Sequence, residues 1–336
     1  MHPFRRAPAL LLLSLCAWAA ACPAPAAAAT GEPAWRSVAS ANRPAARHEN
    51  AFVALDGRLY LLGGRGERPL QIFDPATRRW SEGAAPPQEL HHLQAVAHDG
   101  RLWAIGALTG GFPDEPPVTT VLTYDPASDR WQAGAPLPEG RQRGGGGLVV
   151  HEGQFYVIGG LTRGHLGGYV PWADRFDPVS GRWTALPDAP HPRDHFHAAV
   201  LDGKLYAAGG RTSSHATGET FSRTIVAVDV YDLAAGTWST LDAPLPTARA
   251  GSATVAHGGR IVVIGGESGS QQLAHAEVEA YDPASGRWTT LAPLPVGRHG
   301  TQATLLDGAI HIAAGSGNRG GGPELDDHLV YAPAAD

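Results

Sequence analysis

The sequence is poor in cysteine and in charge. It has only two cysteines, Cys16 and Cys22, and both lie near the start of the chain. The remainder can therefore form neither a disulfide nor a cysteine-ligated metal site. Charged residues make up 17% of the chain and the formal net charge is −6. An acidic chain without a run of lysine or arginine cannot neutralise many phosphates, so we expect no nucleic-acid partner.

Long apolar stretches are also lacking after the first residues. A membrane-spanning helix needs about 20 apolar residues, and no segment beyond residue 29 provides them. Near the start, Arg5 and Arg6 precede an apolar stretch that runs to Ala21, and small residues occupy 26–29. This is the pattern of a cleavable secretory signal, which we predict at residues 1–29 of a periplasmic or extracellular protein. A lipid anchor at Cys22, which follows three alanines, is the alternative.

Glycine and proline, in contrast, are abundant. The chain has 43 glycines and 28 prolines. Both residues disfavour helix interiors, whereas short strands joined by many turns accommodate them. The composition therefore predicts an all-β chain.

A repeat of about 50 residues runs along the chain. Its most regular feature is a tryptophan, found at Trp35, Trp80, Trp131, Trp183, Trp238 and Trp288. An aromatic residue followed by aspartate precedes each of the last five, as in Phe73-Asp74 and Tyr124-Asp125. Further upstream, apolar segments end in glycine pairs, namely Gly63-Gly64, Gly159-Gly160, Gly209-Gly210 and Gly265-Gly266.

These residues resemble the kelch repeat from Trp35 to about Pro333. The resemblance implies a six-bladed β-propeller with four antiparallel strands per blade, which we assign to residues 30–336. In the first repeat we expect strands at 50–55, 58–62 and 70–73, an outermost strand at Trp80, and a tight hairpin at Asp56-Gly57. The segment at Trp35 lacks three preceding strands and the segment 329–331 lacks a following one. We therefore predict that the Trp35 strand completes the last blade and pairs its open edge.

Loop lengths separate the two faces of the predicted propeller. The hairpins and the Asp-Pro turns are short, whereas most connections after the glycine pairs are long. Long loops on a rigid scaffold often carry binding residues, and the innermost strands begin on this same face. Aligned on the hairpins, these strand starts place ionisable side chains around the axis. We predict that the following residues bind a ligand there: Arg47, His48, Glu49, His91, His92, Arg143, Arg193, His195, His197, Arg249, Arg298 and His299.

Two families with this repeat suggest specific chemistry. Galactose oxidase needs a cysteine cross-linked to a tyrosine, and the predicted propeller has no cysteine. The N-acetylneuraminate epimerases are similar in size, blade number and export, and the resemblance implies a catalytic glutamate directly after a glycine pair, with an arginine on the same loop. Glu267 matches the glutamate, but 268–276 contains no arginine. We take Glu267 and His195 as the catalytic candidates if the protein is an enzyme.

The function we predict is binding of a small, polar, anionic ligand of the carbohydrate type, in a funnel of arginine and histidine side chains. Arginines would bond a carboxylate, and histidines would add hydrogen bonds or transfer protons. A sialic-acid mutarotase-like epimerase is the enzymatic form of this hypothesis. A non-catalytic module for proteins or glycans is the first alternative, since other kelch domains bind proteins, and a histidine-bound metal is the second. We expect a monomer without a cofactor or metal, because arginines in the same ring would repel a cation.

Overall fold

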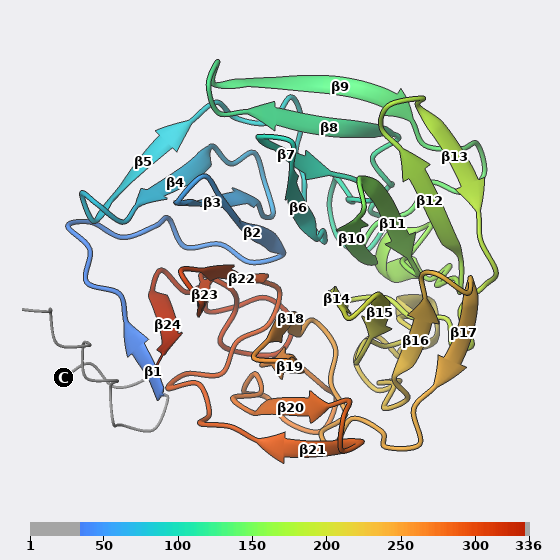
Figure 1. The fold of residues 1–336 in the computed structure, drawn as a ribbon. Coiled ribbons are helices and arrows are strands. Elements are labelled where there is room, and N and C mark those ends of the chain that lie inside the picture. Colours follow the sequence, from blue (N-terminus) through green and yellow to red (C-terminus); the bar gives the residue numbers. More distant parts are fainter. Residues whose placement is uncertain (1–33, 333–336) are drawn as a thin grey trace, which may run out of the picture.

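The computed structural model describes residues 34–332, which form a ring of six four-stranded antiparallel sheets (Figure 1). The predicted signal peptide and Cys22 lie outside the described residues. Within residues 34–332 no helix is long and apolar enough to cross a membrane. The chain is thus an all-β, six-bladed propeller, as the repeat predicted.

Each blade runs from an innermost strand at the axis to an outermost strand at the rim. The first three blades contain β2 (Asn50–Leu55), β3 (Arg58–Gly63), β4 (Leu70–Asp74) and β5 (Arg79–Gly83); β6 (Ala95–His98), β7 (Arg101–Ala104), β8 (Thr120–Asp125) and β9 (Arg130–Pro136); and β10 (Gly147–His151), β11 (Gln154–Ile158), β12 (Ala173–Asp177) and β13 (Arg182–Ala185). The last three contain β14 (Ala198–Leu201), β15 (Lys204–Ala207), β16 (Asp229–Asp232) and β17 (Thr237–Thr240); β18 (Ala253–His257), β19 (Arg260–Ile264), β20 (Val278–Asp282) and β21 (Arg287–Thr290); and β22 (Ala303–Leu306), β23 (Ala309–Ala313), β24 (His328–Ala332) and β1 (Ala34–Ser37).

The first hairpin of each blade is a two-residue turn with a left-handed backbone. At Asp56-Gly57 the φ angles are 48° and 73°, and Asp99-Gly100, Asp202-Gly203 and Asp307-Gly308 are similar. Turns of this kind match the twist of the flanking strands and favour Asp-Gly. The predicted hairpins are therefore confirmed, and they fix which residues of β2 and its equivalents face the neighbouring blades.

The glycine pairs lie where adjacent blades touch. A side chain on Gly63 would come within 2.5 Å of the backbone oxygen of Leu90 in the next blade, and one on Gly265 within 2.3 Å of that of Arg298. The second glycine of a pair donates its N–H to the same oxygen, as Gly64 does to Leu90 at 2.8 Å. A side chain at Gly63 or Gly265 would collide with the next blade, so the glycine pairs allow the blades to approach closely.

The ring closes as predicted, through β1. This strand pairs antiparallel with β24, with Trp35 opposite Tyr331 and Ser37 opposite Leu329. The Trp35 ring packs 5.3 Å from that of Tyr331, and its indole N–H donates to the backbone oxygen of Ala292 in the preceding blade at 3.0 Å. The edge of the sixth sheet is thus covered by the start of the described chain.

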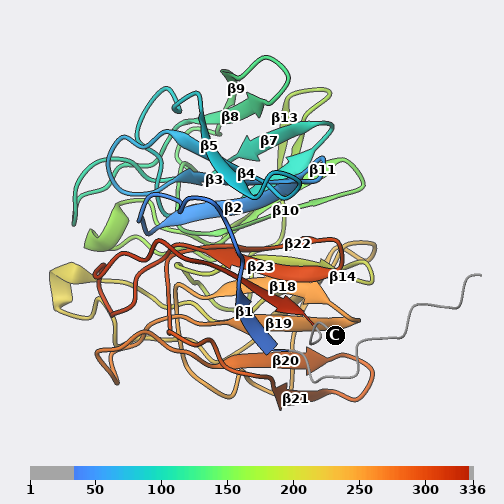
Figure 2. The same ribbon diagram turned by 90° about the vertical axis from the view of Figure 1, so that its left-hand side faces the viewer.

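The connections between the second and third strands of the blades gather on one side of the ring, at the left of Figure 2. Two of them contain short 3-10 helices, η1 (Gly164–Leu166) and η2 (His215–Thr217). The backbone at the start of each innermost strand opens onto this long-loop face.

Candidate functional site

Six residues, one per blade, form a belt around the axis at the starts of the innermost strands. They are Glu49, His92, Gly145, His195, Gly251 and Gly300, with φ angles of 58°, 49°, 68°, 51°, 63° and 63°. Each of the last five donates its N–H to the backbone oxygen of the one before at 2.5–3.0 Å, and the Asn50 N–H closes the circle on Gly300 at 3.2 Å. Glycine suits this left-handed backbone, whereas glutamate and histidine adopt it at a cost. Three blades thus carry the side chains of Glu49, His92 and His195 at a position that is glycine in the other three.

Two adjoining hollows lie on the axis. The inner hollow, with an empty volume of about 310 Å³, is lined by all six belt residues and by Asn50, Phe196 and His197 among others. The outer hollow, of about 280 Å³, shares Glu49 and His92 with it and opens on the long-loop face. Its other lining residues are His48, Arg65, Phe112, His165, Phe221, Glu267, His299 and Gly320. The belt thus connects a mouth formed by loops to a space deeper in the ring.

Two glutamines occupy the axis at the level of the innermost strands. Gln94 donates to the backbone oxygen of Ala198 at 2.8 Å and accepts from the N–H of Leu148 at 2.9 Å. Gln302 donates to the backbone oxygen of Ala95 at 2.9 Å. The bonds to Ala198 and Ala95 join innermost strands of blades that are not neighbours in the ring, so the two side chains restrict the axis at that depth.

The predicted ring of arginines does not face the ligand space, which corrects the funnel expected from the sequence. Five arginines, 0–2% exposed, line neither hollow and instead bond backbone oxygens within their own blades: Arg47, Arg143, Arg193, Arg249 and Arg298. Four of them also pair with acidic residues, namely Asp174, Asp229, Glu279 and Asp327, at 2.6–2.8 Å. A buried guanidinium needs such partners, and these contacts assign the arginines to holding each blade together.

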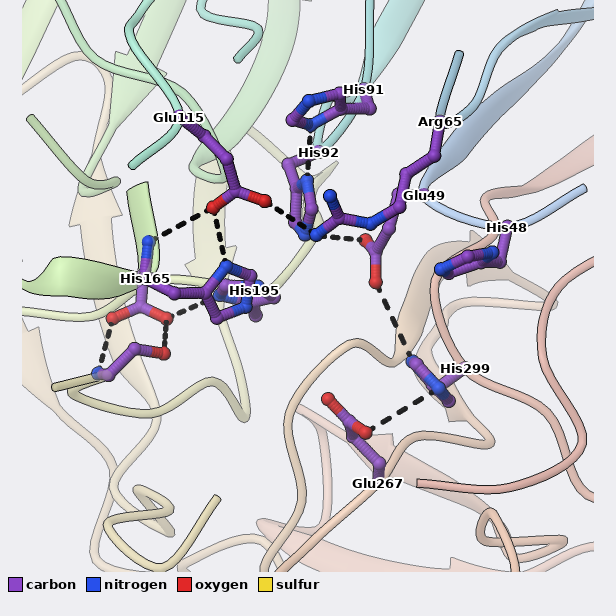
Figure 3. Close-up of polar contacts among 12 residues, drawn as sticks. His48, Glu49, Arg65, His91, His92, Glu115, His165, His195, Glu267 and His299 are labelled. Carbon is purple, nitrogen blue, oxygen red and sulfur yellow. Dashed lines mark hydrogen bonds and ion pairs between the residues drawn. The ribbon is translucent and has the colours of Figure 1, made fainter. Parts of the chain in front are cut away.

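Four histidines gather on one side of the belt (Figure 3). His91, His92 and His195 were predicted as site residues, and His165 was not. The rings of His92, His165 and His195 lie 4.7–5.1 Å apart, centroid to centroid. His91 backs this cluster, with its Nδ1 2.6 Å from that of His92. Burial lowers the pKa of His92 and of His195 well below the ordinary value, helped by the surrounding histidines and by Arg211 near His195.

Acidic residues fix two of these rings. The Nδ1 atom of His165 lies 2.6 Å from Glu115, and that of His195 lies 2.5 Å from Asp194. Glu115 also accepts from Arg65 at 2.5 Å. Burial raises the pKa of Glu115, but His165 and Arg65 outweigh it and bring the pKa to about 2. The carboxylate is therefore ionised, and it orients one ring nitrogen of His165 away from the hollow.

The opposite side of the outer hollow holds Glu267 and His299. Glu267 accepts from Arg211 at 2.5 Å and from the Gly320 N–H at 2.8 Å, and lies 3.5 Å from Nε2 of His299. Burial raises the pKa of Glu267, while His299 and Arg211 lower it more, to about 2. The arginine next to this glutamate thus comes from the preceding blade, not from its own loop. His48, 2.8 Å from Glu324, lies beside His299.

The two catalytic candidates lie in different parts of the site. His195 lines the inner hollow and Glu267 the outer one. Among residues 34–332, two groups place potential metal-ligand atoms within 4.8 Å of one another: His92, His165 and His195, and His91, His92 and Glu115.

Sequence reasoning missed His165, Glu115, Arg65 and Phe112 as site residues. His165, Glu115 and Phe112 lie within long loops that differ in length between blades, so only loop length pointed to them, and it located the face but not the side chains. Arg211 lies on such a loop as well. Arg65 directly follows Gly63-Gly64, the repeat position that Glu267 occupies in its own blade.

A family model described as the Attractin/LZTR1 β-propeller matches residues 28–274. The chain belongs to the kelch-repeat β-propeller family. It is 30% identical to a kelch-like protein, terF, of Aspergillus terreus over 288 residues, which cover 80% of this chain and 61% of the relative. It is 25% identical to kelch-like protein 25 of Xenopus tropicalis, covering 77% of this chain and 43% of the relative. The chain thus spans about half the length of these relatives.

A solved structure titled "Structure of YjhT" has the same architecture. It superimposes with a TM-score of 0.74, covers 88% of this chain and 97% of its own, and shares 16% sequence identity. This likeness shows the propeller fold.

Proposed function

We propose that the chain binds a small polar molecule of the sugar-acid class in the outer hollow. The observation that supports this most directly is the combination lining the hollow: two carboxylates, four histidines, an arginine and two phenylalanines around about 280 Å³ of empty volume. Small-molecule pockets combine apolar walls with a few polar groups that fix the orientation of the ligand. The lining of this hollow therefore suits a small polar ligand.

Each chemical part of such a ligand has a counterpart in the hollow. Glu49 and Glu267 accept hydrogen bonds from hydroxyl groups, and the buried Nδ1 of His299 has no hydrogen-bond partner among the described residues. Arg65 and Arg211 each pair with a carboxylate, Glu115 and Glu267, but the Arg65 side chain is 25% exposed and that of Arg211 1% exposed. Arg65, which lines the hollow, is therefore the guanidinium that a ligand carboxylate can reach. Phe112, half exposed at the mouth, offers a face to the apolar side of a sugar ring.

A thermal-shift panel of neutral hexoses and sugar acids tests the proposal. We expect sugar acids to raise the melting temperature and neutral hexoses to have little effect, and Arg65→Met to abolish the shift. Arg68→Met is the matched control, since Arg68 lies on the same loop but pairs with Glu324 and does not line the hollow. Stabilisation by neutral sugars alone would contradict the assignment of Arg65. If no small molecule stabilises the protein, recognition of a protein or glycan by the loops becomes the better hypothesis.

A mutarotase-like isomerase is a second candidate, favoured by the position of His299. Its Nε2 lies 3.5 Å from Glu267 and its Nδ1 3.8 Å from Glu49. Mutarotation removes a proton from the anomeric hydroxyl and returns one to the ring oxygen, so an imidazole between two carboxylates suits it. NMR of anomer interconversion should show acceleration by the protein that falls about 10²-fold or more in His299→Gln. His215→Gln, on η2, is the control, and a wild-type protein that does not accelerate interconversion excludes the isomerase while leaving binding intact.

A further inference from the structure

The cluster of His92, His165 and His195 has a geometry that neither the fold nor sugar binding requires. His92 and His195 belong to the belt, and His165 enters from η1 on the loop of the third blade. That blade contributes Gly145 to the belt. A Cβ added at Gly145 would lie 3.9 Å from Cβ of His92 and 3.9 Å from the backbone nitrogen of His195. The third ring thus comes from a loop, at the blade whose belt position has no side chain.

Hydrogen bonds at Nδ1 decide which nitrogen each ring presents to the others. Carboxylates only accept, so His165 donates its Nδ1–H to Glu115 and His195 donates its Nδ1–H to Asp194. His91 donates from Nε2 to the backbone oxygen of Gly110 at 2.9 Å, which leaves its Nδ1 to accept from Nδ1–H of His92.

All three rings of the cluster therefore carry a lone pair on Nε2. The Nε2 atoms of His92 and His195 are buried and have no hydrogen-bond partner among the described residues. That of His165 has only a 3.4 Å contact with Arg211. Buried ring nitrogens without a protein partner are unusual, and a water or an ion can supply the missing partner. A ring held at Nδ1 by a carboxylate, with Nε2 free, is the arrangement found around metal-ligating histidines.

The local charge also suits a cation. Arg65 pairs with Glu115 and Arg211 with Glu267, so each arginine is neutralised by its own carboxylate. Glu49, with one oxygen 3.5 Å from Nε2 of His92, then remains as a carboxylate beside the cluster, whereas Asp194 lies 3.8 Å from Arg211. The arginines that led us to expect a metal-free funnel from the sequence point instead into the blades.

We propose that His92, His165 and His195 bind one divalent transition-metal ion of the zinc class, with the remaining coordination position open toward Glu49 and the hollows. Three histidines with an open position form a common catalytic zinc site, with Zn–N distances of about 2.0–2.1 Å. The ligand nitrogens lie within 4.8 Å of one another, and they would draw together to roughly 3.3 Å around a tetrahedral ion. The other group, His91, His92 and Glu115, is less suitable because its atoms already bond one another, Arg65 and His165.

Metal analysis of protein purified without a histidine tag tests this proposal, which does not rest on the sugar-acid proposal. We expect close to one equivalent of zinc after dialysis against zinc and then metal-free buffer, and a cobalt(II)-loaded protein with the visible absorption of a low-coordinate site. His165→Gln, on a loop where it should not disturb the ring, should weaken zinc affinity at least 100-fold. Glu115→Gln should weaken it about 10–100-fold, because it frees the His165 ring.

His299→Gln is the matched control, because His299 is equally buried in the same hollow but outside the cluster. The His299→Gln protein should retain the full equivalent of zinc. The proposal is overturned if folded wild-type protein binds no zinc at micromolar concentration, or if His165→Gln keeps a full equivalent with unchanged affinity. Melting-temperature shifts with sugar acids, measured on chelator-treated protein, test the sugar-acid proposal without metal. Failure of either proposal therefore does not decide the other.

Discussion

At the scale of single residues, the belt differs from blade to blade in whether its left-handed position is glycine. Three blades have glycine in the belt, whereas the other three place Glu49, His92 and His195 in the same left-handed conformation. In a protein built from repeats, the glycine-bearing blades show what the scaffold needs at this position. The three exceptions mark where side chains were kept for another reason.

Replacing a strained belt residue should therefore stabilise the protein. For Glu49→Gly we expect the free energy of unfolding to rise by roughly 0.5–1 kcal/mol, the difference between a left-handed penalty of about 1–2 kcal/mol and the entropic cost of glycine. Urea denaturation would measure it. The reverse change, Gly300→Ala, should destabilise, since its Cβ would meet Glu49 at 2.9 Å and its φ is 63°. A Glu49→Gly protein less stable than wild type would show that Glu49 stabilises the ring.

A buried histidine at the seam between the last and first blades should make stability depend on pH. His328 lies 4% exposed within 5.6 Å of the rings of Phe73 and Trp80, and its Nε2 contacts His311. Burial, with His311 and Arg298, lowers the pKa of His328 to about 3. The unfolded chain then takes up a proton at His328 from about pH 6.5 downward while the folded chain does not, so stability is full above pH 6.5 and falls with pH below it.

The change His328→Leu should remove this part of the acid sensitivity. Between pH 7 and pH 5 the wild type should lose about 2 kcal/mol at this residue, by proton linkage. The variant should lose correspondingly less, as measured by urea denaturation at both pH values. His151→Leu, at the outer end of an innermost strand, is the control. Equal losses in the His328→Leu and wild-type proteins would contradict this origin.

At the scale of elements, the closing strand β1 is the part of the ring whose loss should matter most. Trp35 is 7% exposed, contacts Tyr331 and bonds the backbone of Ala292. The fifth blade packs against this strand through that bond, while Asn42 continues the seam by bonding the backbone of Trp80 at 2.9 Å. Closure thus joins three blades.

The change Trp35→Ala should lower the free energy of unfolding by about 3–5 kcal/mol, the usual range for removal of a buried aromatic side chain. A chain that begins after Ser40 should lose more, because the edge of β24 is then unpaired. Trp238→Ala is the control, since that tryptophan at the equivalent position is less buried and should cost less. The melting temperature should fall most in the shortened chain, less in Trp35→Ala and least in Trp238→Ala. An unchanged melting temperature for the shortened chain would contradict closure by β1.

At the scale of the whole molecule, the predicted export would set the conditions in which the site works. The predicted signal at residues 1–29 lies outside the described residues, and the propeller contains no cysteine that an oxidising compartment would pair. We propose that the protein acts in the periplasm or outside the cell, as a monomer.

Mass spectrometry of protein from a secreting host would check export. We expect a mature chain that begins at Thr30. A chain that begins at a lipidated Cys22 would identify the membrane-anchored alternative. Intact protein that retains Arg5 and Arg6 in the cytoplasm would contradict export altogether.

The sequence by itself determined the ring. Tryptophans, Asp-Gly hairpins and glycine pairs act over a few residues or between equivalent places in neighbouring blades, so a linear pattern reveals them. The same register placed Glu49, His92 and His195 among the residues expected around the axis, and the chain's first and last repeat segments predicted the closing strand β1.

Only the tertiary structure decided which side chains meet. The arginines beside the belt turn into their blades, because buried guanidinium groups find backbone oxygens and carboxylates there. His165 joins His92 and His195 from a loop that follows no repeat, and Arg211 pairs with Glu267 of the next blade. Periodicity fixes where strands lie, but a loop's path depends on contacts between blades that are distant in the chain, and the chemistry of this site depends on those contacts.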